Sequence, residues 1–289
     1  TPIKNQGICG SCWAFAAVGV AEAVTNIGFH NDTLDPDMSE QYLVTDCAPN
    51  IGDCAGGWGP SALRYIRDEG IPDEACLPYH DGDPDGCTFD SEGCDEAMCT
   101  FHGNDGCSDY CCSDRCSDWQ SRLYSLARVS TVGSPSRDDI KTALLAHGPL
   151  AVSIYMGGSF DANGVYRCTD PLSTNHGVSI VGYDDAGGYW MVRNSWGSGW
   201  NGDGYFKVAY GNCHIEQYFT AADLVACNDP NELNDSADLA TPITYAQTIE
   251  ADICSSGDQD FYAFTGATGD KVVVDIDAQS AGSSLDSYI

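Results

Sequence analysis

Gln6-Gly-Ile-Cys-Gly-Ser-Cys-Trp-Ala-Phe15 is the stretch of sequence that decides the fold. It leads into residues 12–27, which are apolar almost all the way round at helical spacing and contain no proline, so they predict a helix buried inside the protein. Cys12 then stands at the N-terminus of that helix, where backbone N–H groups and the helix dipole favour the thiolate. Because the thiolate is the nucleophilic form of cysteine, this stretch indicates cysteine chemistry.

Two kinds of cysteine chemistry fit the stretch. Cys9-Gly-Ser-Cys12 is a C-x-x-C motif, which is typical of thioredoxin-type oxidoreductases, but that function favours a βαβ context that the surrounding sequence lacks. A catalytic nucleophile instead needs a remote imidazole as base and a group that orients the imidazole. His176 is the best candidate of the six histidines because it stands at the mouth of a predicted strand. Asn194 ends the next strand and is followed by two tryptophans that can shield a hydrogen bond from water.

The remaining pattern predicts a helical first half and a mostly antiparallel second half. We expect further helices at residues 39–45, 61–68 and 137–146. We expect strands at residues 150–155, 177–183, 189–193 and 205–209, each bounded by Gly, Asn or Asp.

Composition limits the compartment and the partners. The 289 residues include 43 acids and 12 bases, and the formal charge of −31 excludes a nucleic acid held by phosphate neutralisation. The longest apolar run, residues 13–21, is far shorter than the roughly 20 residues of a membrane span. Sixteen cysteines at irregular spacing favour a secreted protein with disulfides over a metal-binding one. The chain begins at Thr1 without Met, so we expect that a targeting segment and a propeptide were removed or never included.

Three blocks, residues 6–15, 175–183 and 194–206, resemble the active-site blocks of papain-like cysteine peptidases, in the same order. The resemblance covers residues 1 to about 222 and implies an α+β fold with a helical lobe, a β-barrel lobe and a cleft between them. It implies that Cys12 is the nucleophile, His176 the general base and acid, and Asn194 the orienter of the imidazole. Gln6 becomes an oxyanion donor together with the Cys12 N–H. Trp196 would shield the hydrogen bond between the histidine and the asparagine.

The same resemblance supplies substrate contacts and disulfides. Gly56 and Gly57 are expected to present their backbone to an extended peptide. Trp200 is a further substrate-binding candidate, and Tyr218 is expected at the floor of the pocket for the residue two before the cut, where it would shorten the pocket. The pocket walls are expected to be Trp58, Gly59, Ser153 and Thr174. The implied disulfides are Cys9–Cys54, Cys47–Cys87 and Cys168–Cys213, with Cys227–Cys254 as an open alternative.

A metal prediction rests on the acidic segment. Asp81-Gly-Asp-Pro-Asp-Gly-Cys-Thr-Phe-Asp-Ser-Glu92 matches the D-x-D-x-D-G-x5-E spacing of a calcium loop, with ligands from Asp81, Asp83, Asp85 and Glu92. A solvated acidic loop is the alternative, because Asp-rich stretches produce such matches easily. A weaker calcium candidate combines Glu232, Asn234, Asp235, Asp258 and Asp260. We expect no required cofactor, and calcium only as a structural ion.

The domain prediction has three parts. Residues 1–222 form the peptidase domain, with a Cys- and Asp-rich insertion at 88–118; residues 223–236 form a linker; and residues 237–289 form an incomplete all-β sandwich that resembles the prepeptidase C-terminal domain of secreted proteases. The insertion occupies the place of the loop that restricts cathepsin B to removing dipeptides. That loop uses two adjacent histidines, which are absent here, so we expect an endopeptidase acting on polypeptides. The alternative is a binding module in which the insertion and the tail carry the function.

Overall fold

The computed structural model describes residues 2–29, 34–80, 112–169, 171–224, 240–244, 247 and 261–267. The chain divides into two compact units. Described residues up to 224 belong to the first unit, and those from 240 onward to the second. The first unit carries every residue of the candidate active site.

A buried helix organises the first lobe of this unit. Helix α1 (Cys12–Gly28) is buried over most of its length, as its apolar sequence predicts, and α3 (Gly59–Glu69) packs against it. Helix α2 (Glu40–Val44) begins at Ser39, whose side chain accepts a hydrogen bond from the Tyr42 N–H. The lobe also holds a short hairpin and two 3₁₀ helices, which are β1 (Gly52–Asp53), β2 (Gly56–Gly57), η2 (Cys112–Asp114) and η3 (Trp119–Arg122).

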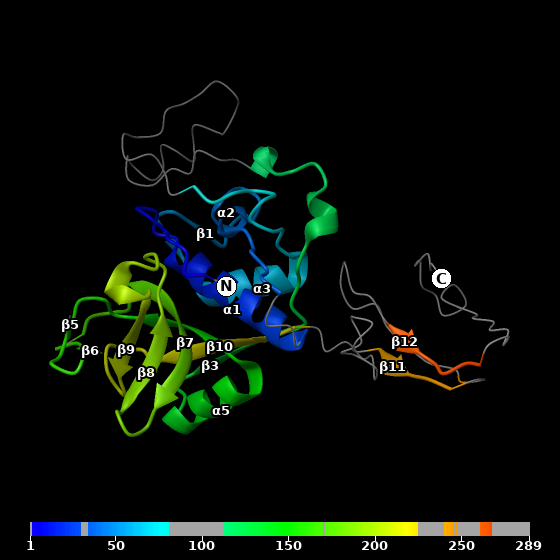
Figure 1. Cartoon of the computed structure of the whole chain (residues 1–289). Helices are drawn as coiled ribbons and strands as arrows, with labels where there is room; N and C mark the ends of the chain where they lie inside the picture. The colour runs from blue at the N-terminus through cyan, green and yellow to red at the C-terminus, as the bar shows by residue number, and fades with distance from the viewer. Residues whose placement is uncertain are drawn as a thin grey trace. The chain divides into compact units, whose positions relative to one another are not determined.

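The second lobe is built on an eight-stranded sheet with the strand order β3-β10-β4-β7-β8-β9-β6-β5 (Figure 1). Its pairs are antiparallel except for β6 with β9. The strands are β3 (Arg128–Gly133), β4 (Leu150–Ile154), β5 (Ser159–Phe160), β6 (Val165–Arg167), β7 (His176–Asp184), β8 (Tyr189–Arg193), β9 (Tyr205–Ala209) and β10 (Tyr218–Asp223). Helix α5 (Arg137–His147) packs on this sheet.

Helix α1 joins the two lobes because it contacts β7, β4 and β10 as well as the other helices. The backbone of β7 passes over the first turn of α1 at Gly177. A Cβ atom added there would lie 3.0 Å from the Cys12 carbonyl oxygen, so a side chain would force the strand away from the helix. This approach places the start of β7 beside the start of α1.

The helices and strands predicted within residues 2–224 are confirmed, and no boundary differs by more than two residues. The sequence pattern did not predict β3 and β10, which pair over their whole length at one edge of the sheet, or the short β5 and β6. Disulfides Cys9–Cys54 and Cys168–Cys213 are confirmed. The predicted Cys47–Cys87 bond is wrong, because Cys47 bonds to Cys112. A further bond, Cys76–Cys116, was not predicted.

In the second unit, β11 (Thr241–Pro242) pairs in parallel with β12 (Tyr262–Ala263). The Cys227–Cys254 pair and both calcium candidates lie outside the described residues. Among the helices that the structure describes, none is long and apolar enough to cross a membrane.

Candidate active site

Cys12 is the first residue of α1 and the only cysteine with a free thiol among those that the structure describes. Burial raises the pKa of this thiol, and backbone N–H groups of Gly177, Trp13 and Cys12 itself lower it. The Gly177 N–H belongs to the start of β7, whereas the Trp13 and Cys12 N–H groups lie in the first turn of α1, where N–H groups have no partner within the helix. Burial is the larger effect, so the pKa of Cys12 is raised overall, and the expectation that the helix N-terminus favours the thiolate does not hold for the buried thiol. The same N–H groups can donate to the sulfur once it is anionic.

His176 begins β7 and is almost fully buried, with its Nε2 atom 2.8 Å from Oδ1 of Asn194. The backbone N–H of Ser195 donates to the same Oδ1 at 2.9 Å, which fixes the amide with its oxygen toward the imidazole. An amide oxygen only accepts, so Nε2 carries the proton and Nδ1 is left to exchange a proton with a reacting group. Burial lowers the pKa of His176, and the bond to Asn194 opposes that change.

The ring of Trp196 lies against the ring of His176. Its centroid lies 4.7 Å from that of His176, with the two planes tilted by 34°. Trp200, the first residue of η4 (Trp200–Gly202), packs edge-on against Trp196 at 5.1 Å and against Phe206 at 5.2 Å. Trp200 therefore packs against Trp196 and supports its ring. It also stays a candidate for a substrate contact.

Gln6 is held in place by both lobes. Its backbone N–H donates to the Ser195 carbonyl at 2.8 Å, and its Oε1 accepts from the Ser195 hydroxyl at 2.7 Å. Its Nε2 donates one proton to the Cys9 carbonyl at 2.9 Å. The second Nε2 proton is available for a ligand. Ser195 was missed by the sequence analysis, although its position directly after Asn194 was a signal.

Two glycines border the site on the first lobe. Gly57 lies against the Trp13 ring so closely that a Cβ atom would come within 2.4 Å of it, whereas nothing lies near the Cβ position of Gly56, at a φ of +136°. Both glycines are exposed. Both residues of β2 are therefore exposed to solvent, and their contact with an extended peptide stays a prediction.

Tyr218, Ser153 and Trp58 come together as predicted. The hydroxyls of Tyr218 and Ser153 are 2.5 Å apart, and the Tyr218 ring lies 6.2 Å from the half-exposed Trp58 ring. Burial raises the pKa of Tyr218, so its hydroxyl stays neutral in the physiological range. Gly59 is buried at the start of α3, and Thr174 is half-buried two residues before β7.

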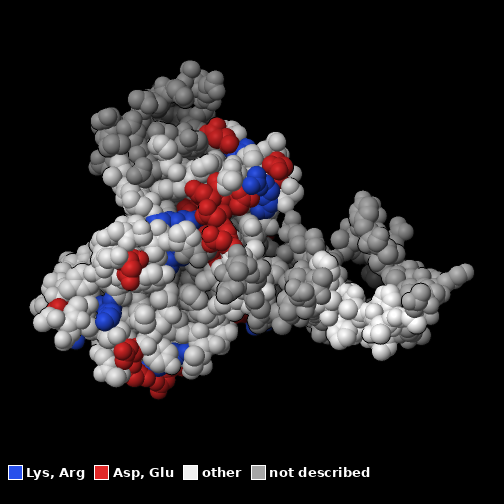
Figure 2. Space-filling view, in the orientation of Figure 1, with Lys and Arg blue, Asp and Glu red and all other residues white. Residues whose placement is uncertain are grey.

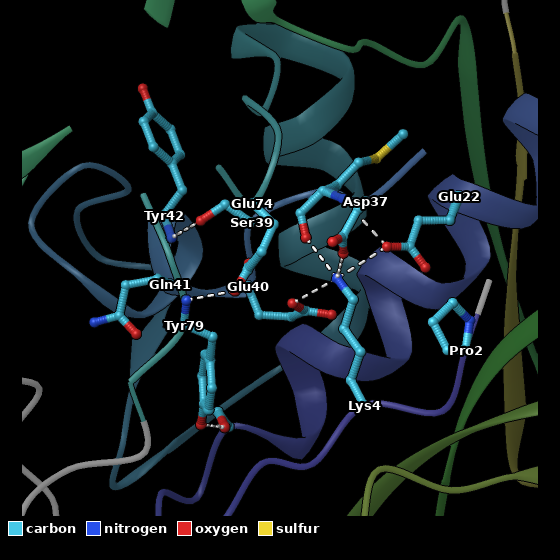
Figure 3. A network of polar contacts seen from close by, with 12 residues as sticks. Pro2, Lys4, Glu22, Asp37, Ser39, Glu40, Gln41, Tyr42, Glu74 and Tyr79 are labelled. Carbon is cyan, nitrogen blue, oxygen red and sulfur yellow. Dashed lines mark hydrogen bonds and ion pairs between the residues drawn. The ribbon is translucent and has the colours of Figure 1, made fainter. Parts of the chain in front are cut away.

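A charged cluster lies behind the site, and the sequence analysis missed it. Nζ of Lys4 lies 3.0 Å from the Glu22 carboxylate, 2.7 Å from Asp37 and 3.0 Å from Glu40, and it donates to the Met38 carbonyl at 2.8 Å (Figure 3). Acidic side chains gather over the helical lobe in the space-filling view (Figure 2). The signal was Glu22, an acid within an apolar helix, because a buried carboxylate requires a partner. Lys4 lies two residues before Gln6, so the cluster anchors the segment that carries Gln6.

The two alternative chemistries were a redox-active cysteine pair and metal binding. A redox-active Cys9–Cys12 pair is wrong for this chain, because Cys9 is bonded to Cys54 and Cys12 is free. Within the described ranges, no group of three or more His, Cys, Asp or Glu side chains could hold a metal ion. The calcium loop at 81–92 lies outside those ranges and stays a prediction.

Comparison with known proteins agrees with this geometry. Residues 1–223 match the model of the family described as papain family cysteine protease. The chain is 35% identical to digestive cysteine proteinase 3 of Homarus americanus over 74% of this chain and 60% of that protein. It is 34% identical to a cathepsin L-like protein of Caenorhabditis elegans over 72% and 56%, respectively. The chain spans about half to two thirds of the length of these relatives.

Solved structures give the same result. A mite allergen structure, from work on Blo t 1 and Der p 1, aligns with a TM-score of 0.59 at 27% identity, covering 78% of this chain and 67% of that one. Digestive procathepsin L2 of Tenebrio molitor aligns with a TM-score of 0.57 at 30% identity, covering 78% and 64%. The fold, the free cysteine at the start of α1 and the family match lead to one conclusion: the chain belongs to the papain family of cysteine proteases.

Proposed function

We propose that this chain is a secreted cysteine endopeptidase that hydrolyses peptide bonds through Cys12, His176, Asn194 and Gln6. The observation that carries the proposal is the hydrogen bond of 2.8 Å between His176 and Asn194 under the Trp196 ring, beside a free Cys12 at a helix N-terminus. A structural role alone would not require a free thiol at this place. Four disulfides among the described cysteines support an oxidising, extracellular compartment.

The acylation step uses these groups in sequence. His176 takes the thiol proton of Cys12 through Nδ1 and becomes an imidazolium. The thiolate so formed attacks the carbonyl carbon of the substrate, and the resulting oxyanion accepts hydrogen bonds from the Cys12 N–H and from Nε2 of Gln6. The His176 imidazolium then gives its Nδ1 proton to the leaving amine as the C–N bond breaks. The bond from Asn194 keeps the imidazole oriented during both proton transfers.

Deacylation reverses the proton transfer with water in place of the amine. His176 removes a proton from water through Nδ1, the hydroxide attacks the thioester carbon, and the C–S bond breaks to release the carboxylate. These steps use side chains of this chain only, and calcium is kept solely as a structural ion for the loop at 81–92.

We propose that the substrate is a polypeptide bound along Gly56 and Gly57 as an added strand, with one side chain directed toward Trp58 and Tyr218. We also propose that the chain has three parts. They are a peptidase domain at 1–222 with the insertion at 88–118, a linker at 223–236 and a partial β-domain at 237–289. A propeptide that is removed during maturation is also proposed, because the solved relatives include procathepsins.

The test is a fluorogenic peptide that is blocked at both ends, which an enzyme dependent on a free terminus cannot process. Wild-type protein should cleave it, and Cys12→Ala should reduce kcat by several orders of magnitude. Ser61→Ala, a change on α3 outside the site, serves as the folding-matched control and should keep wild-type kcat. Full activity in Cys12→Ala would refute the mechanism, and cleavage only of peptides with a free terminus would refute the endopeptidase.

A further inference from the structure

Tyr79 lies next to the catalytic residues but has no role in the steps above. Its hydroxyl donates to the Gln6 carbonyl at 2.8 Å and lies 2.7 Å from the Ser11 hydroxyl. Tyrosine has a single hydroxyl proton, so when that proton goes to Gln6, the Ser11 hydroxyl must be the donor in the second bond. The Tyr79 ring packs edge-on against Phe15 at 4.7 Å, which fixes the direction of the hydroxyl.

These two bonds join the ends of one short loop. Gln6 carries one proposed oxyanion donor on Nε2, and Ser11 directly precedes Cys12, whose backbone N–H is the other. The loop between them turns at Gly7, with a φ of +58°, and passes so close to Cys54 at Gly10 that a Cβ atom there would lie 2.5 Å from the Cys54 carbonyl oxygen. Tyr79 therefore bridges the two positions whose separation sets the size of the oxyanion site.

The other contacts of Gln6 do not make this bridge. Ser195 holds Gln6 to the second lobe through two side-chain and backbone bonds, and Cys9 accepts from its amide within the loop. Among the contacts described here, the Tyr79 hydroxyl alone touches both Gln6 and the residue before Cys12.

Tyr79 is itself fixed by the first lobe. Its backbone N–H donates to the Glu74 carboxylate at 2.5 Å (Figure 3). The N–H of the following His80 donates to Oε1 of Gln41 at 3.0 Å. Gln41 lies on the buried helix α2, and Glu74 is half-buried in the same lobe. Because the backbone and the ring of Tyr79 are both fixed, its hydroxyl can keep a constant distance between the two groups that it contacts.

We propose that Tyr79 is a positioning residue of the oxyanion hole, which fixes the distance between the Gln6 amide and the Cys12 N–H without touching the substrate. The inference rests on the proposed function. It goes beyond that function because it assigns a catalytic consequence to a residue outside the catalytic set.

Tyr79→Phe tests the inference, because it keeps the ring on Phe15 and removes only the hydroxyl. A displaced donor weakens the stabilisation of the oxyanion, so we expect kcat to fall by about 10-fold with KM little changed, less than the roughly 10²–10³-fold loss when a whole donor is removed. A peptide aldehyde adds to the thiol and places its oxyanion in the same hole, so its affinity should fall by a similar factor. Alkylation of Cys12 by iodoacetamide forms no oxyanion, so its rate should stay within about twofold of the wild-type rate.

Tyr65→Phe is the matched control, because the Tyr65 hydroxyl also bonds a backbone carbonyl, that of Cys47, at 2.7 Å in the same lobe. It should leave kcat and aldehyde affinity unchanged. Unchanged kcat and aldehyde affinity in Tyr79→Phe would overturn the inference, as would an equal fall in the alkylation rate, which indicates general disturbance of the site. Wild-type protein without any Cys12-dependent hydrolysis would instead refute the proposed function, so the two failures are distinguishable.

Discussion

Glu40 offers a quantitative test of the cluster that anchors the N-terminal segment. Its carboxylate is 2% exposed and lies 3.0 Å from the Lys4 ammonium, yet burial outweighs the attraction of Lys4 and raises the pKa of Glu40 to about 8. In the unfolded chain a glutamate titrates near 4.3. The folded state therefore binds a proton that the unfolded state releases between these two values, and stability must fall as pH rises through that window.

Glu40→Gln removes this proton linkage and keeps the shape of the side chain. One proton difference is worth up to about 1.4 kcal/mol per pH unit, so the limit between pH 5 and pH 8 is about 4 kcal/mol. We expect the variant to gain a few kcal/mol in the free energy of unfolding relative to wild type as pH rises from 5 to 8. Lys4 does not change the pH dependence of the free energy of unfolding in this range. The pKa of lysine in the unfolded chain already exceeds 8, and the pKa of Lys4 in the folded protein is raised further. Glu74, whose pKa burial raises to about 7, remains in both proteins, and its charge also raises the pKa of Glu40, so the measured difference includes this coupling.

Urea unfolding of iodoacetamide-blocked protein, followed by tryptophan fluorescence at pH 5 and pH 8, measures this difference. Asp37→Asn is the control: Asp37 also pairs with Lys4, at 2.7 Å, but its side chain is 56% exposed, so the change should cost less than about 1 kcal/mol at either pH. A Glu40→Gln variant that is less stable than wild type by the same amount at both pH values would refute the reasoning, because Glu40 would then be a charged partner of Lys4 throughout.

Three further changes test the site. Trp196→Ala uncovers the bond between His176 and Asn194, so kcat/KM should fall about 10-fold with peptide substrates, and an unchanged value would remove Trp196 as a shield. Tyr218→Ala removes the ring and hydroxyl beside Ser153, so a peptide library should show a shift toward larger side chains two residues before the cut; the same profile as wild type would exclude Tyr218 from the pocket. Gly57→Ala places a methyl group 2.4 Å from the Trp13 ring, so it should destabilise the protein by roughly 1–3 kcal/mol and raise KM, whereas wild-type stability and KM would contradict the close packing.

The catalytic candidates were predictable because their signals are local. Cys12 starts an unusually apolar helix, and His176 and Asn194 each stand at the end of a strand with clear periodicity. The same periodicities predicted a helical first half and a β-rich second half. The family resemblance predicted that these halves form two lobes with a cleft between them. The edge strand β3 was missed because its exposed, mixed sequence carries little alternation.

Long-range pairings were harder to predict, for a physical reason. Cys47 was assigned to Cys87, but seven cysteines lie between residues 81 and 118, and spacing alone cannot choose among them. The Lys4 cluster draws its acids from α1, α2 and the loop before α2, and the bonds of Tyr79 span 68 and 73 residues. Such contacts depend on how the elements pack, which no local pattern encodes.

The central claim is that Cys12 carries the acyl group during hydrolysis, and a trapped intermediate tests it most directly. A doubly blocked peptide ester is mixed with the protein and quenched in acid within milliseconds, and the intact mass and the peptide map are recorded. The account predicts a mass increase equal to the acyl group, located on Cys12 and absent from Cys12→Ala, which should also fail to turn over the ester. Continued turnover by Cys12→Ala, or an adduct on another residue, would contradict it.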